Sequence, residues 1–283
     1  MRILRQVVLI IWCGIGASAL HAQLPFYTDD SEVTDSGTLH FESFDEYDGL
    51  QSSQYPNLRQ NTTNFKVNMG MPHNLELDFD FPYLGIFRTT GSESSEGLGD
   101  MDMGLKWKAR KAGGPWRGPA LATSLYIEFP TGNVKEQLGS GLRDYWLNTI
   151  AQEEFSDKTR MNVNFGFLFA GNTSTGVVGV QTLHGHVYTG GLSLVHDVNA
   201  RLSLGGEVYG GVADVKGLGR DQLQAMLGAQ YALTKLLTVT LAVLGGKYEA
   251  SPPIGGQVGI AVDFPGFVKR WTHAQEPCRR AQE

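Results

Sequence analysis

Residues 74–83 read N-L-E-L-D-F-D-F-P-Y, and apolar side chains alternate with polar ones through this stretch. Successive side chains of an extended strand point to opposite faces, so one face of this strand is apolar and the other is acidic. The apolar face carries Leu75, Leu77, Phe79 and Phe81, and the polar face carries Asn74, Glu76, Asp78 and Asp80. The acidic face requires water. The apolar face requires a cover, which is a second protein layer in a soluble protein and lipid in an outer-membrane barrel.

An export signal begins the chain. Arg2 and Arg5 form a basic region, residues 7–15 an apolar core, and Leu20-His21-Ala22 a small-residue cleavage site. This order is typical of a secretory signal peptide, and we expect cleavage after Ala22. The apolar core is too short to span a bilayer, and no later stretch offers the roughly 20 consecutive apolar residues that a transmembrane helix needs.

The composition limits the class of protein. The chain has 283 residues, with 23 Lys and Arg against 29 Asp and Glu, a formal net charge of −6. An acidic chain is a poor candidate for nucleic-acid binding, which depends on neutralising phosphate with Lys and Arg. Removal of the signal leaves Cys278 as the one cysteine, so no intrachain disulfide can form. The 36 Gly and 11 Pro suit many short strands and turns.

The alternation of the opening stretch recurs along the chain. The connections between the resulting strands alternate between long and short, as an up-and-down barrel requires when both termini stay in the periplasm. The sequence therefore predicts an all-β protein, a single antiparallel transmembrane β-barrel of about 12 strands in the bacterial outer membrane. The expected strands cover residues 37–47, 64–70, 74–83, 99–108, 121–129, 142–153, 161–169, 184–195, 202–208, 222–230, 237–243 and 254–264.

The chain then divides into four parts. These are a signal peptide (1–22), a periplasmic N-terminal segment (23–36), the barrel (37–264) and a polar C-terminal tail (265–283). In the N-terminal segment, Asp29 and Asp30 could be ligands, but two carboxylates in a Thr/Ser/Asp-rich run are more typical of a solvated turn. Aromatic residues near strand ends fit the two interfacial girdles of a barrel: Tyr83, Trp107, Phe129, Phe155, Tyr209, Tyr231, Tyr248 and Phe264.

The polar positions of the alternating strands are the candidate lumen lining. They are Glu76, Asp78, Asp80, Asp102, Lys106, Lys108, Glu128, Glu207, Gln222, Gln224 and Gln257. Lys106 and Lys108 could pair with Glu76, Asp78 or Asp80 across the ladder. About twelve strands predict a narrow, partly filled pore. The acidic excess favours a weak preference for cations or passage of small neutral solutes.

Four segments of the sequence resemble a known family. They are residues 25–30 (P-F-Y-T-D-D), 97–107 (G-L-G-D-M-D-M-G-L-K-W), 128–132 (E-F-P-T-G) and 139–145 (G-S-G-L-R-D-Y). On these motifs the chain resembles the bacterial outer-membrane barrels labelled as meta-pathway phenol-degradation or transporter proteins. The resemblance implies a barrel that moves small, aromatic or hydrophobic solutes, and it supplies no catalytic residues. The polar tail after Phe264 departs from barrels that end on an aromatic residue.

Two other pairs of residues are candidates for a metal site and for a hydrolase site. His184 and His186 could share a metal, but two ligands are too few for a structural zinc site, and we expect no metal and no cofactor. Ser193 and His196 would lie on opposite faces of a strand, which argues against a barrel-embedded hydrolase. We therefore expect a channel or transporter rather than an enzyme, with outer-membrane lipids and small solutes as partners. A closed, structural barrel with a salt-bridged interior is the alternative; the oligomeric state is left open.

Overall fold

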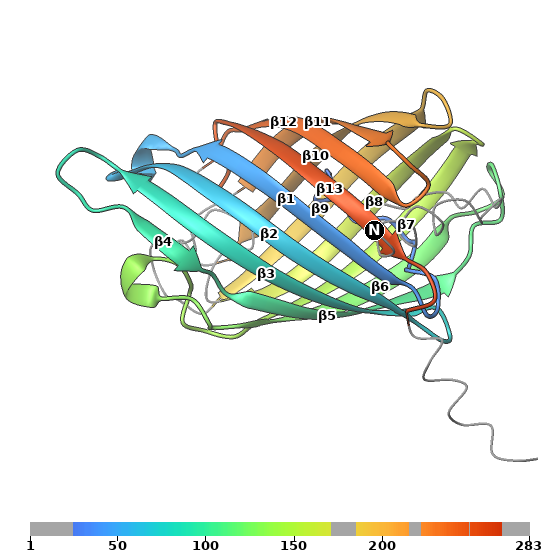
Figure 1. Cartoon of the computed structure of the whole chain (residues 1–283), viewed down its shortest axis with the longest axis horizontal. Coiled ribbons are helices and arrows are strands. Elements are labelled where there is room, and N and C mark those ends of the chain that lie inside the picture. Colours follow the sequence, from blue (N-terminus) through green and yellow to red (C-terminus); the bar gives the residue numbers. More distant parts are fainter. Residues whose placement is uncertain (1–24, 171–184, 215–221, 249, 268–283) are drawn as a thin grey trace, which may run out of the picture.

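The computed structural model describes residues 25–170, 185–214, 222–248 and 250–267, which fold into one sheet of 13 strands (Figure 1). Two short 3-10 helices, η1 (Ser52–Gln54) and η2 (Val134–Glu136), lie in connections. The strands are β1 (Leu39–Gly49), β2 (Asn57–Met71), β3 (Leu75–Arg88), β4 (Ser95–Leu98), β5 (Met101–Arg110), β6 (Ala120–Phe129), β7 (Asp144–Ser156), β8 (Thr159–Ala170), β9 (Gly185–Asp197), β10 (Leu202–Ala213), β11 (Gln222–Ala232), β12 (Leu237–Gly246) and β13 (Ile254–Phe264).

The sheet closes into a barrel. All pairings are antiparallel and join strands adjacent in sequence, except that β5 pairs with β3 and not with β4. β1 also pairs with β13 over its full length, from Leu39 opposite Phe264 to Gly49 opposite Ile254. Both β4 and β5 pair with β3, so these two strands are one wall position interrupted at Gly99 and Asp100. The barrel thus has twelve wall positions, and the predicted all-β antiparallel barrel of about 12 strands is confirmed. Closure removes the free sheet edge that lipid cannot solvate.

The two ends of the barrel differ in their connections (Figure 1). At one end lie the turns 72–74, 157–158, 198–201 and 233–236 and the longer turn 111–119, together with the start of β1 and the end of β13. At the other end lie longer connections, among them 50–56, 130–143 and 247–253. We call these the short-turn end and the long-loop end. In outer-membrane barrels, short turns face the periplasm and longer loops face outward.

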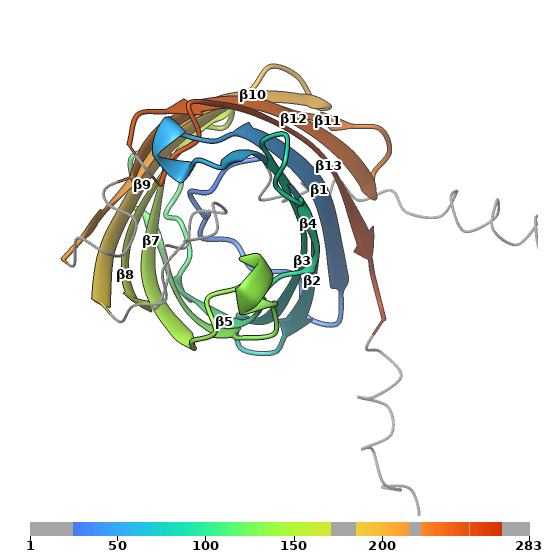
Figure 2. The same ribbon diagram turned by 90° about the vertical axis from the view of Figure 1, so that its left-hand side faces the viewer.

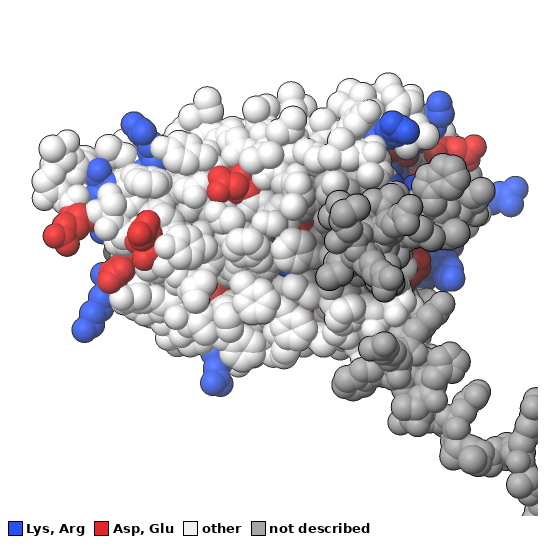
Figure 3. Space-filling model, in the orientation of Figure 1, with Lys and Arg blue, Asp and Glu red and all other residues white. Residues whose placement is uncertain are grey.

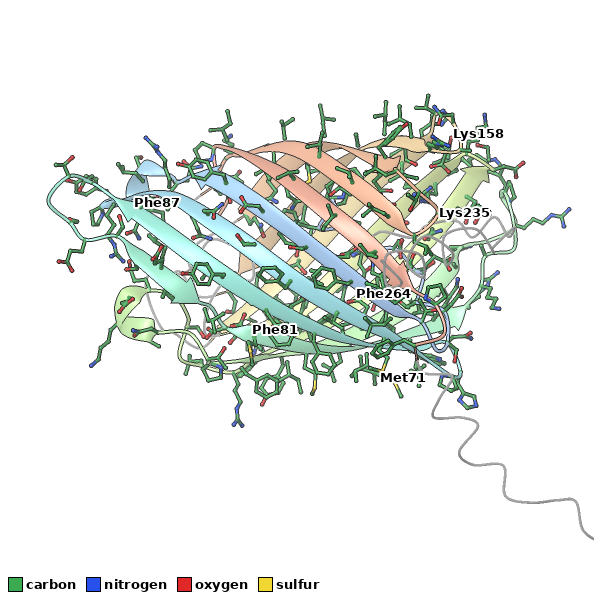
Figure 4. All side chains as sticks on the ribbon, viewed as in Figure 1. Met71, Phe81, Phe87, Lys158, Lys235 and Phe264 are labelled. Carbon is green, nitrogen blue, oxygen red and sulfur yellow. The ribbon has the colours of Figure 1, made fainter. Side chains whose placement is uncertain are left out.

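The outer surface is apolar and the inner surface is polar. Leu227 is 68% exposed and Phe165 is 61% exposed, whereas Glu42 is fully buried and Glu76 is 4% exposed. Figure 3 shows charged side chains mainly toward the two ends of the visible face, with a largely uncharged surface between them. Figure 4 places Phe87 at the long-loop end and Met71, Phe264, Lys158 and Lys235 at the short-turn end. An uncharged band between charged rims is the surface that a bilayer covers. Within the described residues, no helix has the length and apolar character needed to cross a bilayer.

Two of the predicted boundaries are wrong. Strand β2 begins at Asn57 rather than at residue 64, and β3 continues to Arg88 through part of the loop expected at 85–98. The two extensions pair with each other, Asn61 opposite Gly85. On β2 the outward residues Asn61 and Thr63 are polar, and on β3 the inward Leu84 and Ile86 and the outward Phe87 are all apolar. Apolar alternation therefore could not mark this part, although the backbone ladder continues there.

One of the aromatic residues assigned to a girdle is misplaced. Tyr209 of β10 is only 4% exposed and faces the lumen, where its ring lies 6.0 Å from that of Tyr27. It shares the inner face with Glu207, two positions earlier on the strand. By contrast, Trp107 and Phe264 are 48% and 47% exposed on the outer surface near the short-turn end.

A charge placed in the middle of the outer surface should destabilise the barrel. Leu227 lies in the centre of β11, and Leu227→Arg should lower the free energy of unfolding in lipid vesicles by about 2–4 kcal/mol because the guanidinium must enter hydrocarbon. The matched control is Leu233→Arg, in the turn after β11, which should cost about 0–1 kcal/mol near the interface. Urea titrations followed by tryptophan fluorescence measure both values; equal costs would contradict a lipid-facing outer surface.

Candidate functional site inside the barrel

Polar side chains fill the inner face of the wall. Among the residues predicted for the lumen, those at most 9% exposed are Glu76, Asp78, Lys106, Lys108, Glu207, Gln222, Gln224 and Gln257. Asp80, Asp102 and Glu128 are half-buried on the same face. Several of them contact one another or the wall: Tyr126 Oη donates to Asp78 Oδ2 (2.9 Å) and Gln222 Nε2 donates to Gln224 Oε1 (3.3 Å). The candidate site is the space that these residues surround.

The N-terminal segment occupies part of this space. Residues 25–36 run from the start of β1 into the barrel, and Figure 2 shows this segment in blue within the ring of strands. Its innermost part is bound by Glu207 of β10, whose carboxylate accepts hydrogen bonds from the backbone N–H groups of Tyr27 (3.2 Å) and Thr28. Tyr27 Oη also donates to Glu46 of β1. The segment therefore contacts strands from two distant parts of the wall.

An apolar patch receives the ring of Phe26. The side chain is 7% exposed and packs in a cluster with Val195, Met226, Ala242 and Leu244. Glycine lines the wall beneath it, because a Cβ at Gly205 would lie 2.7 Å from the Phe26 ring. Any other residue at this position would collide with the ring, so the bare backbone at Gly205 makes room for an aromatic group inside an otherwise polar lumen.

Two lysines of β5 bind the acidic part of the segment. Lys106 Nζ lies 2.7 Å from Asp29 Oδ1 and 3.6 Å from Asp30 Oδ1, and Lys108 Nζ contacts Glu32 Oε2. Lys106 is 3% exposed and Lys108 is 9% exposed. We name these two residues the lysine pair. Both ammonium groups are thus neutralised by the chain's own N-terminal segment.

These contacts correct the predicted ladder pairs. Lys106 is directly opposite Glu76 in the register of β3 and β5, as the alternation implied. Lys106 nevertheless forms its ion pairs with Asp29 and Asp30, because the segment lies against the inner face of the wall. Glu76 instead accepts a hydrogen bond from the backbone N–H of Thr34.

The interpretation of Asp29 and Asp30 as a solvated turn is wrong. Asp29 is 5% exposed and lies inside the barrel, within a segment that was expected in the periplasm. Burial raises the pKa of the Asp29 carboxyl to about 6; Lys106 acts against this shift, and the carboxylates of Asp30 and Glu76 add to it. The ion pair with Lys106 therefore weakens as the pH falls below about 6.

Further along, the segment is held by an amide of β7. Gln152 Oε1 accepts hydrogen bonds from Ser31, through both its backbone N–H (3.2 Å) and its hydroxyl (3.2 Å). Side chains of β1, β3, β5, β7 and β10 thus form hydrogen bonds or ion pairs with the segment, in addition to the apolar contacts of Phe26. No β-ladder joins residues 25–36 to the sheet, so side chains of the wall hold the segment in place.

A row of carboxylates crosses the wall closer to the long-loop end. The strand register sets Asp80 opposite Asp102, Asp102 opposite Glu128, and Glu128 opposite Asp144. Lys66 lies opposite Asp80 at one end of the row, and its Nζ is 3.6 Å from Asp80 Oδ2. The row thus sets carboxylates of adjacent strands directly opposite each other, an arrangement that destabilises a sheet when both groups are ionised.

One long-loop connection folds inward. Leu138, in the connection 130–143, is 2% exposed and packs against Leu84 and Ile86, which are inward-facing residues of β3. Figure 2 shows η2, in the same connection, within the outline of the barrel. Asp100 fixes the base of this connection by accepting hydrogen bonds from the backbone N–H groups of Gly132 (2.8 Å) and Ser140 (2.6 Å).

Arg88 ties the same connection to its neighbours. Its guanidinium donates to Asn57 Oδ1 (2.9 Å), to Ser95 Oγ (2.7 Å), to the carbonyl oxygen of Glu93 (2.6 Å) and, in the 130–143 connection, to the carbonyl oxygen of Glu136 (3.2 Å) and to Gln137 Oε1 (3.1 Å). Two connections at the long-loop end, 89–94 and 130–143, and the first residues of β2 and β4 thus converge on one side chain.

Sequence reasoning missed part of the inner face. Glu46 and Asp48 of β1 are 3% and 2% exposed inside the barrel, with His40, Glu42 and Lys66 on the same inner surface. Strand β1 did not show them because its pattern is inverted in the middle: Phe44 is 9% exposed and faces inward, while Asp45 faces outward and accepts hydrogen bonds from Asn61 (2.7 Å) and Thr63 (2.9 Å).

Two other candidate sites lie on β9 and just before it. His186 faces outward and its Nδ1 lies 2.8 Å from Asp214 Oδ2, whereas His184 is outside the described residues. Ser193 is buried inside and His196 is on the outer face, so these two side chains do not meet. In the part of the chain that the structure describes, no group of three or more His, Cys, Asp and Glu side chains could hold a metal ion.

Three solved structures with a similar fold are an outer-membrane channel and two porins. The COG4313 outer membrane channel of Pseudomonas putida F1 is 15% identical, with a TM-score of 0.66 over 83% of this chain and 98% of that chain. The NanC porin is 8% identical (TM-score 0.55, 78% and 98% covered), and the KdgM porin in complex with disordered oligogalacturonate is 9% identical (TM-score 0.52, 80% and 99% covered). At these identities the likeness concerns the fold.

Family membership rests on the sequence itself. The sequence has no match among curated proteins. A family profile, however, matches residues 50–262, from the first long-loop connection to β13, which is most of the barrel. This chain is an outer-membrane β-barrel that belongs to the family described as "Putative MetA-pathway of phenol degradation".

Proposed function

We propose that this barrel is a channel for small solutes across the outer membrane, and that the N-terminal segment 25–36 controls passage. The observation that carries this proposal is the way the segment is held. It lies inside a polar lumen, bound by side chains such as Glu207 and Lys106 and by no strand pairing. A segment held in this way can leave the lumen without breaking the sheet.

Aromatic and apolar solutes are the class that we assign. The family description names phenol degradation, and the lumen already accommodates an aromatic ring, that of Phe26, against Gly205 and the apolar cluster around Met226. Movement of the segment would free this patch together with the polar groups around it. A solute with an apolar body and a polar group would then find both kinds of surface in the same lumen.

A closed, structural barrel is the second candidate. The buried ion pairs of Lys106 and Lys108 favour it, because removal of one partner of a buried pair leaves an uncompensated charge. Under this alternative the segment is a permanent filling of the lumen. The two candidates differ in whether current flows once the segment is shortened.

Deletion of residues 26–34 should raise the single-channel conductance in planar lipid bilayers several-fold. The deletion removes the backbone N–H groups that bind Glu207 and the carboxylates that bind Lys106 and Lys108, while Leu39 and the rest of β1 remain in place to close the barrel. A correctly folded barrel migrates faster in detergent gels before heating than after it, and this shift is the folding control. If the folded deletion variant conducts no more than the unmodified protein, the segment does not control passage and the closed barrel is favoured.

The 130–143 connection offers an independent test at the other end. Arg88→Ala removes the two guanidinium contacts with the connection, at Glu136 and Gln137, and leaves the hydrogen bond from Asn57 Nδ2 to Gln137 Oε1 (3.1 Å). The connection should become more accessible, and trypsin should cleave after Lys135 several-fold faster in intact outer membranes. Arg59→Ala is the matched control. The Arg59 guanidinium donates to the hydroxyl of Tyr47 (3.3 Å) and not to the 130–143 connection, so this substitution should leave cleavage unchanged. Equal cleavage in the two variants would contradict an anchoring role of Arg88.

A further inference from the structure

The lysine pair is bound in this structure by carboxylates of the same chain. Lys106 contacts Asp29 and Asp30, and Lys108 contacts Glu32, so three acidic side chains of a movable segment neutralise two ammonium groups. Asp29 and Lys106 are each at most 5% exposed. The contact is therefore a buried carboxylate-binding arrangement, occupied by an internal group.

We propose that the lysine pair is a binding site for an organic carboxylate, a small solute with one carboxylate on an apolar or aromatic body, which replaces the N-terminal segment there. The inference rests on the proposed function, because it requires the segment to leave the lumen. In this view Asp29, Asp30 and Glu32 stand in for the carboxylate of the solute.

The cost of an uncompensated buried charge supports this exchange. If the segment moves away, Lys106 loses Asp29 and Lys108 loses Glu32 as ion-pair partners. A buried charge left without its partner is strongly unfavourable. Two wall carboxylates of β3, Glu76 and Asp78, remain near Lys106. Lys108 is opposite Ala122 in the ladder with β6 and contacts Glu32 of the segment, so departure of the segment leaves Lys108 in need of an anion. A solute with a carboxylate supplies it, and a neutral solute of the same shape does not.

The rest of the vacated surface defines the body of the solute. Phe26 precedes the acidic residues by three positions and fills the apolar cluster of Val195, Met226 and Leu244. The segment thus combines an aromatic ring with nearby carboxylates, and the wall carries a matching apolar patch and lysine pair. Departure of the segment frees both together.

The position of the lysine pair makes the site directional. Lys106 and Lys108 lie in the half of β5 that leads to the turn 111–119, at the short-turn end, whereas Asp102 lies in the other half of the strand, closer to the long-loop end. An anion that enters from the long-loop end meets the acidic row first, and an anion that enters from the short-turn end does not. A carboxylate should therefore act at lower concentration from the short-turn side.

The experiment compares benzoate with benzyl alcohol, its neutral analogue, on the full-length protein in planar bilayers. Benzoate should increase the open fraction of the channel in a concentration-dependent manner, and more strongly from the short-turn side; benzyl alcohol at the same concentrations should not. In the Lys106→Met/Lys108→Met variant the benzoate response should disappear. The matched control is Lys66→Met, which removes a lumenal lysine that pairs with Asp80, and it should keep the response.

A second variant tests the same site if the lysine variant does not fold. Asp29→Asn/Glu32→Gln weakens the competing carboxylates without touching the barrel wall, and should lower the half-maximal benzoate concentration by about tenfold, since less of the protein is held in the occupied state. Equal responses to benzoate and benzyl alcohol, or an unchanged half-maximal concentration in this variant, would overturn the carboxylate site. If the 26–34 deletion variant conducts but benzoate has no effect on the full-length protein, the carboxylate site alone is overturned. If no variant conducts, the proposed function is overturned as well.

Discussion

Backbone hydrogen bonding in hydrocarbon is the constraint on which the rest of this structure depends. Lipid offers no partner for an exposed N–H or C=O group, so the sheet must close on itself, and β1 pairs with β13 along its full length to do so. Closure fixes which side of each strand meets lipid. The outward positions become mainly apolar, as at Leu227 and Phe165, and most charged side chains of the described strands gather in the small space inside. Inward carboxylates and lysines then require partners of opposite charge.

The N-terminal segment satisfies part of that requirement. Its acidic residues neutralise Lys106 and Lys108, and its backbone N–H groups satisfy Glu207 and Glu76. The same polar groups that could attract a solute therefore hold the segment, and the lumen cannot bind both in the same place. The acidic row from Asp80 to Asp144 lies outside this exchange and gives the long-loop end its own electrostatic character.

Sequence reasoning predicted the barrel wall well and its contents poorly, for a physical reason. Alternation with a period of two reports the face of each residue, so Glu76, Lys106 and Glu207 were placed inside from the sequence alone. The partner of an inward residue depends on folding in three dimensions: Thr28 binds Glu207, which is 179 positions later in the chain. Where the pattern is inverted, as at Phe44 and Asp45 in β1, even the face was missed, because a hydrogen bond from Asn61 makes an outward carboxylate tolerable.

The way in which the segment is shared among strands bears on the biogenesis of the barrel. Tyr27, Thr28, Asp29 and Ser31 find their partners on β1, β10, β5 and β7, so neither half of the sheet presents a complete receptor before the two halves have joined. The segment is synthesised first but can settle last. Binding of the segment in the lumen therefore requires a closed barrel. In a precursor whose strands are still being added, the segment is exposed to periplasmic chaperones and proteases.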